Sequence, residues 1–295
     1  MSEDVCLSKE QVLQARAKGT TSLASANTGS TGTLRLHVLA SGSKGNAAIV
    51  ENTRTGQGLL IDAGICKRDV LSRAEEAGFP LENLKATLIT HEHSDHVKGL
   101  GVLYREFAKR NLEVPLYVNE DSKWASKAIR ELDGIAEIKG LDEGQQLSLA
   151  GLQVAPFATS HDSISSFGFR IWDGLDCLGY MTDTGIVTEA AHEALVGCRI
   201  LAIEANHDPN MLENGPYPYH LQQRVASDLG HLSNDQSADE LRSLLHPGLQ
   251  QVMAMHISEN NNTYRLPVEA LRSVIDEEGH GTSVACAYQN RLVSC

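Results

Sequence analysis

From Leu34 onward, apolar and polar positions alternate with two different periods. Short apolar runs that end in glycine or polar residues are typical of buried strands, and apolar residues three or four apart are typical of helices. The predicted strands cover 34–40, 46–51, 58–62, 85–90, 115–118, 135–138, 145–149, 152–158, 167–172, 176–182, 199–204, 251–256 and 283–288. The predicted helices cover 67–77, 96–110, 120–131, 187–195, 218–228, 234–245 and 267–277.

These elements form two blocks rich in strands, and each block is followed by helices. A sheet and a helix must each bury an apolar face against another layer. The pattern therefore predicts an α/β domain over residues 34–295, in which two mixed sheets pack face to face with helices outside.

Residues 1–33 have a different character. The stretch 8–19 is compatible with a short helix that begins at a Ser8 and Gln11 capping box. The stretch 20–33 is rich in serine, threonine, glycine and alanine, a composition typical of flexible linkers. We expect residues 1–33 to form an N-terminal appendage and linker, to which we assign no role.

The composition favours a soluble enzyme, with 41% hydrophobic and 21% charged residues. No apolar stretch approaches the roughly 20 residues of a membrane span. The N-terminus is acidic and has no apolar segment of the kind found in signal peptides, which favours a cytoplasmic location. The six cysteines include no C-x-x-C pair, so we expect reduced thiols and not a disulfide framework or a zinc ribbon.

The formal net charge of −13 excludes binding to nucleic acid through bulk attraction. A phosphate substrate must then be held by local cations, which bound metal ions can supply.

The segment Thr90-His-Glu-His-Ser-Asp-His96 is the densest group of potential ligands in the chain. It follows a predicted strand and precedes a predicted helix. Side chains two apart in an extended segment point the same way, so His91 and His93 can converge on one point. Asp95 and His96 follow at once and face a second point nearby if the chain turns there.

Four further polar residues each stand directly after a predicted strand, namely Asp62, His161, Asp183 and His256. A single residue of this kind is most often a cap. With the 90–96 segment, however, five histidines and, besides Asp62, two aspartates are available for two sites. Imidazole and carboxylate ligands without thiolate suit Zn²⁺, and also Mn²⁺ or Fe²⁺.

The T-H-x-H-x-D-H segment and the later single ligands resemble the metallo-β-lactamase superfamily, from about Leu34 to the C-terminus. The resemblance implies an αββα sandwich with a dinuclear metal site at one edge. The site would hold two divalent ions, with Zn²⁺ preferred and Mn²⁺ or Fe²⁺ as alternatives. The implied ligands are His91, His93 and His161 for the first ion, Asp95, His96 and His256 for the second, and Asp183 as a bridge. Asp62 is implied to fix the 90–96 loop through hydrogen bonds.

Two shorter segments resemble tRNase Z. Ala202-Ile-Glu204-Ala-Asn is similar to its H-E-A-T segment, and Gly230-His231-Leu-Ser-Asn is similar to its G-H-S-T loop. In that family the Glu and the His pair, and the His helps the leaving oxygen depart. The alternative for His231 is a histidine in a helix-capping loop.

Longer stretches resemble the YycJ/WalJ group of the superfamily, whose members are described as metal-dependent hydrolases, some with DNA exonuclease activity. These stretches begin at Leu39, Glu204, Asn214, Gly230 and His256. The implied function is a dinuclear-metal phosphodiesterase or nuclease, DNA exonuclease-like, that uses a metal-bridging hydroxide on a nucleic acid substrate. Asp95 would orient that hydroxide and accept its proton, and Glu204 would orient His231.

Substrate-binding residues are less clearly marked. The segment from Ser41 through Ser43 to Asn46 is compatible with backbone N–H groups that hold a phosphate, and equally with a plain hairpin turn. His207 is expected either to line the cleft or to cap the next helix.

Two other functions remain open. One is a hydrolase of a small cyclic phosphate, lactone, thioester or β-lactam. The other is a non-catalytic binding protein, whose signature would be missing ligands, and here none is missing.

Overall fold

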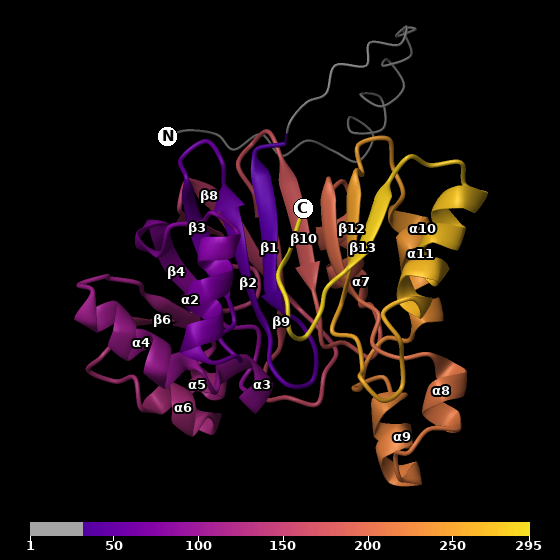
Figure 1. Cartoon of the computed structure of the whole chain (residues 1–295), viewed down its shortest axis with the longest axis horizontal. Coiled ribbons are helices and arrows are strands. Elements are labelled where there is room, and N and C mark those ends of the chain that lie inside the picture. Colours follow the sequence, from indigo (N-terminus) through magenta and orange to yellow (C-terminus); the bar gives the residue numbers. More distant parts are fainter. Residues whose placement is uncertain (1–31) are drawn as a thin grey trace, which may run out of the picture. The chain divides into compact units, whose positions relative to one another are not determined.

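The computed structural model describes residues 32–295, which contain two sheets of seven strands each (Figure 1). In order across the first sheet lie β14 (Val293–Ser294), β1 (Leu34–Ala40), β2 (Ala47–Asn52), β3 (Gln57–Ile61), β4 (Leu84–Leu88), β5 (Leu116–Val118) and β6 (Ile138–Gly140). Across the second lie β13 (Ser283–Cys286), β12 (Gln251–Met255), β11 (Ile200–Glu204), β10 (Cys177–Met181), β9 (Phe167–Trp172), β8 (Leu152–Ala158) and β7 (Leu147–Leu149). Both sheets are mixed. Strands β3 to β6 are parallel in the first, and β10 to β13 are parallel in the second.

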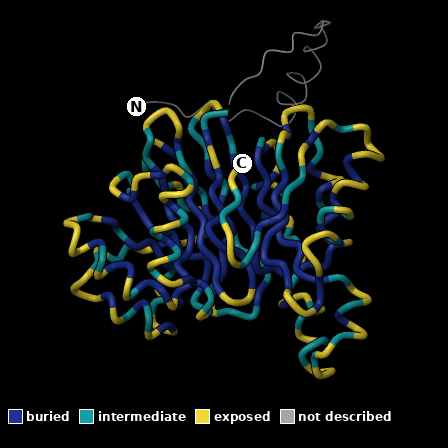
Figure 2. Tube along the Cα trace, viewed as in Figure 1, coloured by how far each residue is buried: buried dark blue, intermediate teal, exposed yellow. Residues whose placement is uncertain are grey.

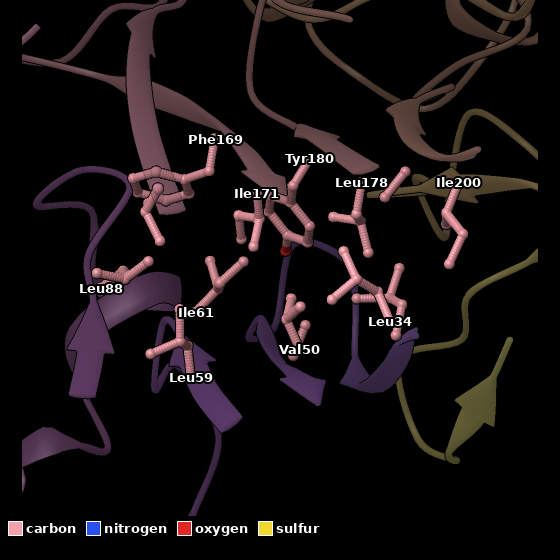
Figure 3. Packing of buried hydrophobic residues seen from close by; sticks show 14 of the residues in the cluster. Leu34, Val50, Leu59, Ile61, Leu88, Phe169, Ile171, Leu178, Tyr180 and Ile200 are labelled. Carbon is pink, nitrogen blue, oxygen red and sulfur yellow. The ribbon is translucent and has the colours of Figure 1, made fainter. Parts of the chain in front are cut away.

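The two sheets bury one apolar face against each other, and Figure 3 shows this layer. Leu59 and Ile61 of β3 point toward the second sheet, where Phe169 and Tyr180 pack against the first sheet. Leu60, between them, points the other way and packs under the helices. Both faces of the central strands are therefore buried, which explains why their sequences are continuous apolar runs.

Helices cover the outer face of each sheet. Those packed on the first sheet include α2 (Lys67–Glu76), η1 (Leu81–Asn83), α3 (Ser94–Val97), α4 (Leu100–Lys109) and α6 (Lys127–Arg130), and α5 (Glu120–Ala125) contacts α6. Those on the second are α7 (Glu189–Leu195), α10 (Asn234–Leu244) and α11 (Leu266–Glu277). Exposed residues lie mainly on the helices and connecting loops, and the strands between them are buried (Figure 2). The predicted sandwich with helices outside is confirmed.

The structure corrects two predicted helices. The expected helix 96–110 is divided at Gly99, whose N–H donates to Ala63 O (2.8 Å) and so leaves the helical ladder. The expected helix 120–131 is divided at Ser126, which is extended (φ −95°, ψ 118°). A short helix that was not predicted, α8 (Pro209–Glu213), precedes α9 (Tyr219–Val225).

The predicted helix 8–19 and most of the predicted linker lie outside the described residues, so the domain boundary near residue 33 stays a prediction. Within residues 32–295, no helix combines the length and the apolar character needed to cross a membrane.

Candidate metal centre

The carboxyl ends of the parallel strands carry the site. Asp62 follows β3, Thr90 to His96 follow β4, Asp183 follows β10, Glu204 ends β11 and His256 follows β12. Ligand sites in sheets of this kind are expected beyond the carboxyl ends of the strands. Because β3 and β4 belong to one sheet and β10 to β12 to the other, both sheets contribute to the site.

Three of these strand-end residues have left-handed backbone. The φ angles are 60° at Asp62, 56° at Asp183 and 52° at His256. Such angles are uncommon for residues other than glycine, and each costs about 1–3 kcal/mol. Strain of this kind persists where the surrounding structure holds a side chain in one direction, which is typical of functional sites.

His91, His93 and His161 form the first group of potential ligands. Their nearest ring nitrogens lie within 4.8 Å of one another, and His161 Nε2 is 3.3 Å from His93 Nδ1. His161 Nδ1 donates to Gly230 O (3.1 Å), which turns Nε2 toward the other two rings. His91 Nε2 is buried and has no hydrogen-bond partner.

Asp183 lies at the centre of the second group. Its Oδ1 is 2.8 Å from His256 Nδ1, and its Oδ2 is 3.4 Å from His96 Nε2. Asp95 Oδ2 lies 3.6 Å from His96 Nε2 and 3.8 Å from His256 Nε2. Asp183 Oδ1 is also 3.9 Å from His161 Nε2, so the two groups meet at this carboxylate. The structure thus brings all seven predicted ligands together.

Asp62 is completely buried behind the ligands. Its Oδ1 accepts from Thr90 N (2.9 Å), and its Oδ2 accepts from Thr90 Oγ1 (2.9 Å) and from His96 Nδ1 (2.7 Å). These bonds leave His96 Nε2 facing Asp183. A carboxylate behind a candidate ligand imidazole can fix its tautomer and its orientation, which is the role that the resemblance implies for Asp62.

The titration of the site residues is shifted by burial and by neighbouring charge. Burial lowers the pKa of His91 well below its usual value, and also lowers the pKa of His161. Burial acts the same way on His96, but Asp183, Asp62 and Asp95 outweigh it and raise the pKa of His96 to about 9. Burial raises the pKa of Asp183, yet His256 and His96 outweigh it and hold that pKa well below its usual range. The carboxylate is therefore ionised, as a metal ligand must be.

A divalent metal ion fits these residues. His91 Nε2 and Asp183 Oδ2 are buried without a hydrogen-bond partner. Leaving such atoms unsatisfied costs free energy, which coordination of a cation would recover. Imidazole and carboxylate without thiolate form the ligand set expected for Zn²⁺ and similar ions.

Beside the ligands, Glu204 and His231 form the pair expected from the sequence. Glu204 is completely buried, and its Oε1 accepts from His231 Nδ1 at 2.7 Å. Its Oε2 accepts from Thr184 N (2.8 Å), which fixes the carboxylate. Because Nδ1 is engaged, Nε2 is the nitrogen of His231 that can act on a substrate. The His231 side chain is 20% exposed.

The loop from Ser41 to Asn46 is already hydrogen-bonded within the protein. The N–H groups of residues 41, 42, 44, 45 and 46 all donate to protein oxygens, which leaves Ser43 N as the amide available to a phosphate. Ser41 Oγ accepts from His256 N (2.7 Å), and Asn46 Nδ2 lies 3.1 Å from His96 Nε2. Ser41 and Asn46 therefore contact two candidate ligands, and Ser43 N remains the candidate amide for a phosphate.

His207 is buried, and its Nδ1 has no hydrogen-bond partner. It does not cap α8, because Asp208 occupies the cap position and accepts from Met211 N (2.8 Å). Burial lowers the pKa of His207 to about 4, so the ring is neutral at pH 7.

Sequence reasoning missed Glu92 and Gly64. Glu92 accepts from Ser122 Oγ (3.1 Å) and Ile164 N (2.9 Å), which ties the ligand loop to α5 and to the loop that carries His161. At Gly64 an added Cβ would lie 1.5 Å from Asp95 O, so only glycine fits. The position of Glu92 between two ligands was a signal for its role. No signal in the sequence marked Gly64, because its contact with Asp95 O joins two segments that are distant in the chain.

Replacing Gly64 with alanine should damage both the fold and the ligand loop. The added carbon would push the 95–96 backbone away, and overpacking of this kind costs about 1–3 kcal/mol or more. We expect the free energy of unfolding to fall by at least about 2 kcal/mol, with lower metal content. Chemical denaturation and metal analysis measure the two effects. Gly281→Ala is the control, because nothing lies within 4 Å of the added carbon there. Equal behaviour of the two variants would refute the steric argument.

The sandwich and its cluster of histidines and aspartates define the class of the protein as a metal-dependent hydrolase. Residues 58–257 match the family described as "Beta-lactamase superfamily domain". The chain belongs to this family, the metallo-β-lactamase superfamily.

Two curated relatives are similar over most of the chain. The protein named exodeoxyribonuclease YycJ of Bacillus anthracis is 31% identical over 255 residues, covering 85% of this chain and 93% of the relative. Exodeoxyribonuclease WalJ of Streptococcus pneumoniae is 34% identical over 232 residues, covering 78% and 83%. Among solved structures, the metallo-β-lactamase fold protein YhfI of Bacillus subtilis superposes with a TM-score of 0.67. That alignment covers 89% of this chain and 99% of YhfI at 16% identity, so it bears on the fold alone.

Proposed function

We propose that this protein is a dinuclear-metal phosphodiesterase that degrades DNA as an exonuclease. The observation that carries the proposal is the Glu204–His231 pair beside the carboxylate of Asp183, with His231 Nδ1 3.9 Å from Asp183 Oδ1. A histidine so placed can protonate the oxygen that leaves phosphorus. The names of the two curated relatives support DNA as the substrate.

Two divalent ions would be held by the seven ligands. The proposed sets are His91, His93 and His161 for one ion, Asp95, His96 and His256 for the other, and Asp183 for both. Zn²⁺ suits this set, with Mn²⁺ or Fe²⁺ as alternatives. When bound, two ions supply a nucleophile at neutral pH and stabilise the charge on the attacking and leaving oxygens.

Asp95 is the proposed base. Its side chain is 21% exposed at the edge of the ligand group, and Asn46 Nδ2 donates to its Oδ2 (3.4 Å). A carboxylate oriented in this way can position the attacking water and accept its proton. Asn46 would restrict the rotation of the carboxylate.

His231 is the proposed acid. Glu204 holds its Nδ1, so the imidazole presents Nε2 to the substrate and the carboxylate stabilises the protonated ring. His207 Nδ1 is buried without a partner, and burial keeps this ring neutral. We place Ser43 and His207 at the border of the substrate cleft, Ser43 through its free amide.

The proposal is tested by assaying metal-reconstituted protein on linear and circular DNA, on RNA, on bis-p-nitrophenyl phosphate and on a β-lactam. Linear DNA should be assayed both with and without a 5′-phosphate. We expect cleavage of linear DNA and of the small phosphodiester, with negligible turnover of the β-lactam and of circular DNA. Efficient β-lactam turnover without cleavage of any phosphodiester would overturn the proposal, and cleavage of bis-p-nitrophenyl phosphate without cleavage of DNA or RNA would indicate a small phosphodiester substrate.

A further inference from the structure

A groove of about 590 Å³ lies on the side of the second sheet, at its edge strand. One wall is formed by α11, and the floor is formed by β13 and by the segment from Tyr288 to Val293. Figure 1 shows β13 and α11 as neighbours at one edge of the second sheet. None of the seven proposed metal ligands lines this groove.

The groove presents an aromatic surface. The rings of Tyr264 and Tyr288 lie with their centroids 4.5 Å apart, at an interplanar angle of 48°. The guanidinium of Arg291 lies 3.5 Å from the centroid of the Tyr288 ring. Tyr264 is 36% exposed, so part of its ring is available to a ligand. Stacked aromatic and guanidinium groups of this kind are surfaces on which nucleobases stack.

The groove also carries local positive charge. Arg265, Arg272 and Arg291 line it, against the single carboxylate of Glu269. Arg265 pairs with Glu269 at 3.4 Å, whereas Arg272 and Arg291 are exposed and form no ion pair within residues 32–295. In a chain with a formal net charge of −13, two unpaired arginines beside an aromatic pair mark a local site for an anion.

One residue connects the groove to the metal centre. Gln289 N donates to the hydroxyl of Tyr264 (3.4 Å), and Gln289 Nε2 donates to Gly45 O (2.8 Å). Gly45 precedes Asn46, whose Nδ2 lies 3.1 Å from His96 Nε2. The groove therefore borders the loop that contacts the candidate ligands.

We propose that this groove binds the single-stranded part of the nucleic acid substrate outside the metal centre. One base stacks on Tyr264, and backbone phosphates contact Arg272 and Arg291. The proposal rests on the proposed nuclease function. It deepens that function, because it assigns a second subsite that holds the strand while one end is cleaved.

The first test measures binding of a fluorescent phosphorothioate oligothymidylate to the full-length, metal-loaded protein by anisotropy. Tyr264→Ala should raise Kd about tenfold, whereas Tyr264→Phe, which keeps the ring, should bind nearly as the wild type does. Arg272→Ala and Arg291→Ala should weaken binding and lower the salt slope of log Kd by about 0.7 each. Arg105→Ala is the matched control, because it removes one exposed arginine from α4, on the other sheet. Groove variants that behave like Arg105→Ala would overturn the proposal.

The second test separates the groove from the chemistry. Bis-p-nitrophenyl phosphate offers one phosphate and no flanking strand, so its hydrolysis reports on the metal centre. Normal hydrolysis with a raised KM for oligonucleotides in Tyr264→Ala and Arg272→Ala supports the groove. A different result separates the two proposals. If the wild-type protein cleaves no phosphodiester but the variants still lose oligonucleotide binding, the nuclease function is wrong and the binding role of the groove is supported. If Arg272→Ala abolishes self-association in sedimentation and leaves oligonucleotide binding intact, the groove is an interface between two copies and the proposal fails.

Discussion

Asp183→Asn is expected to reduce phosphodiester hydrolysis by at least about a thousandfold and to lower the metal content of the protein. Loss of a hydrogen-bond partner behind a ligand typically costs about 10–100-fold, and Asp183 is proposed as a direct ligand of both ions. Its carboxylate lies within 3.9 Å of nitrogens of four histidines: His96, His161, His231 and His256. An amide in its place supplies one neutral oxygen and no charge.

The substitution is chosen to preserve the fold. Asparagine is among the residues that best tolerate left-handed backbone, so the φ of 56° at this position can be retained. Asp208→Asn is the control, because it removes the same charge and still accepts the capping bond of α8. Activity and metal analysis should separate the two variants, and circular dichroism should show that both are folded. If Asp183→Asn keeps its full metal complement and its activity, the bridging assignment is wrong.

His231→Ala is expected to reduce cleavage of DNA by about 10²–10⁴-fold, the usual contribution of a positioned acid. Both ions should stay bound, because His231 follows the loop after α9 and is held by Glu204, outside the proposed ligand set. The loss of hydrolysis rate relative to the wild type should be smaller for bis-p-nitrophenyl phosphate, because p-nitrophenolate departs without a proton. Rates on both substrates, with metal content measured on the same samples, check the assignment.

Two results would contradict this role for His231. An equal deficit on both substrates, together with lower thermal stability, would indicate a structural histidine. Loss of one ion would make His231 a ligand, since its Nδ1 is close to Asp183 and belongs to a second possible cluster with Glu204 and His256. Glu204→Gln should reduce DNA cleavage less than His231→Ala does. The amide still contacts Nδ1 of His231 but no longer stabilises the protonated ring.

The sequence was sufficient for the architecture because buried strands and amphipathic helices have different periods. It also singled out candidate site residues that the structure brings together, since Asp62, His161, Asp183 and His256 each follow an apolar run. Positions at the ends of strands are the places where a side chain leaves the core and meets the site. In this fold, the end of an apolar run in the sequence therefore marks a position beside the site.

Contacts between distant segments could not be predicted in the same way. The break at Gly99 depends on Ala63 O, and the amides of the 41–46 loop are engaged by Asn46, Asp95, Tyr288 and Gln289. The groove beside α11 joins residues whose neighbours along the chain suggest only a solvated helix and an edge strand. Such features depend on which segments meet, and local composition does not encode this.

The left-handed backbone at Asp62, Asp183 and His256 also bears on how this chain can change over generations. Aspartate, asparagine and histidine tolerate such angles better than most side chains, so each position admits few replacements. Most substitutions there would add backbone strain to the loss of buried polar contacts. In a gene copy no longer selected for hydrolysis, these positions should therefore change more slowly than exposed positions, because the fold itself still constrains them.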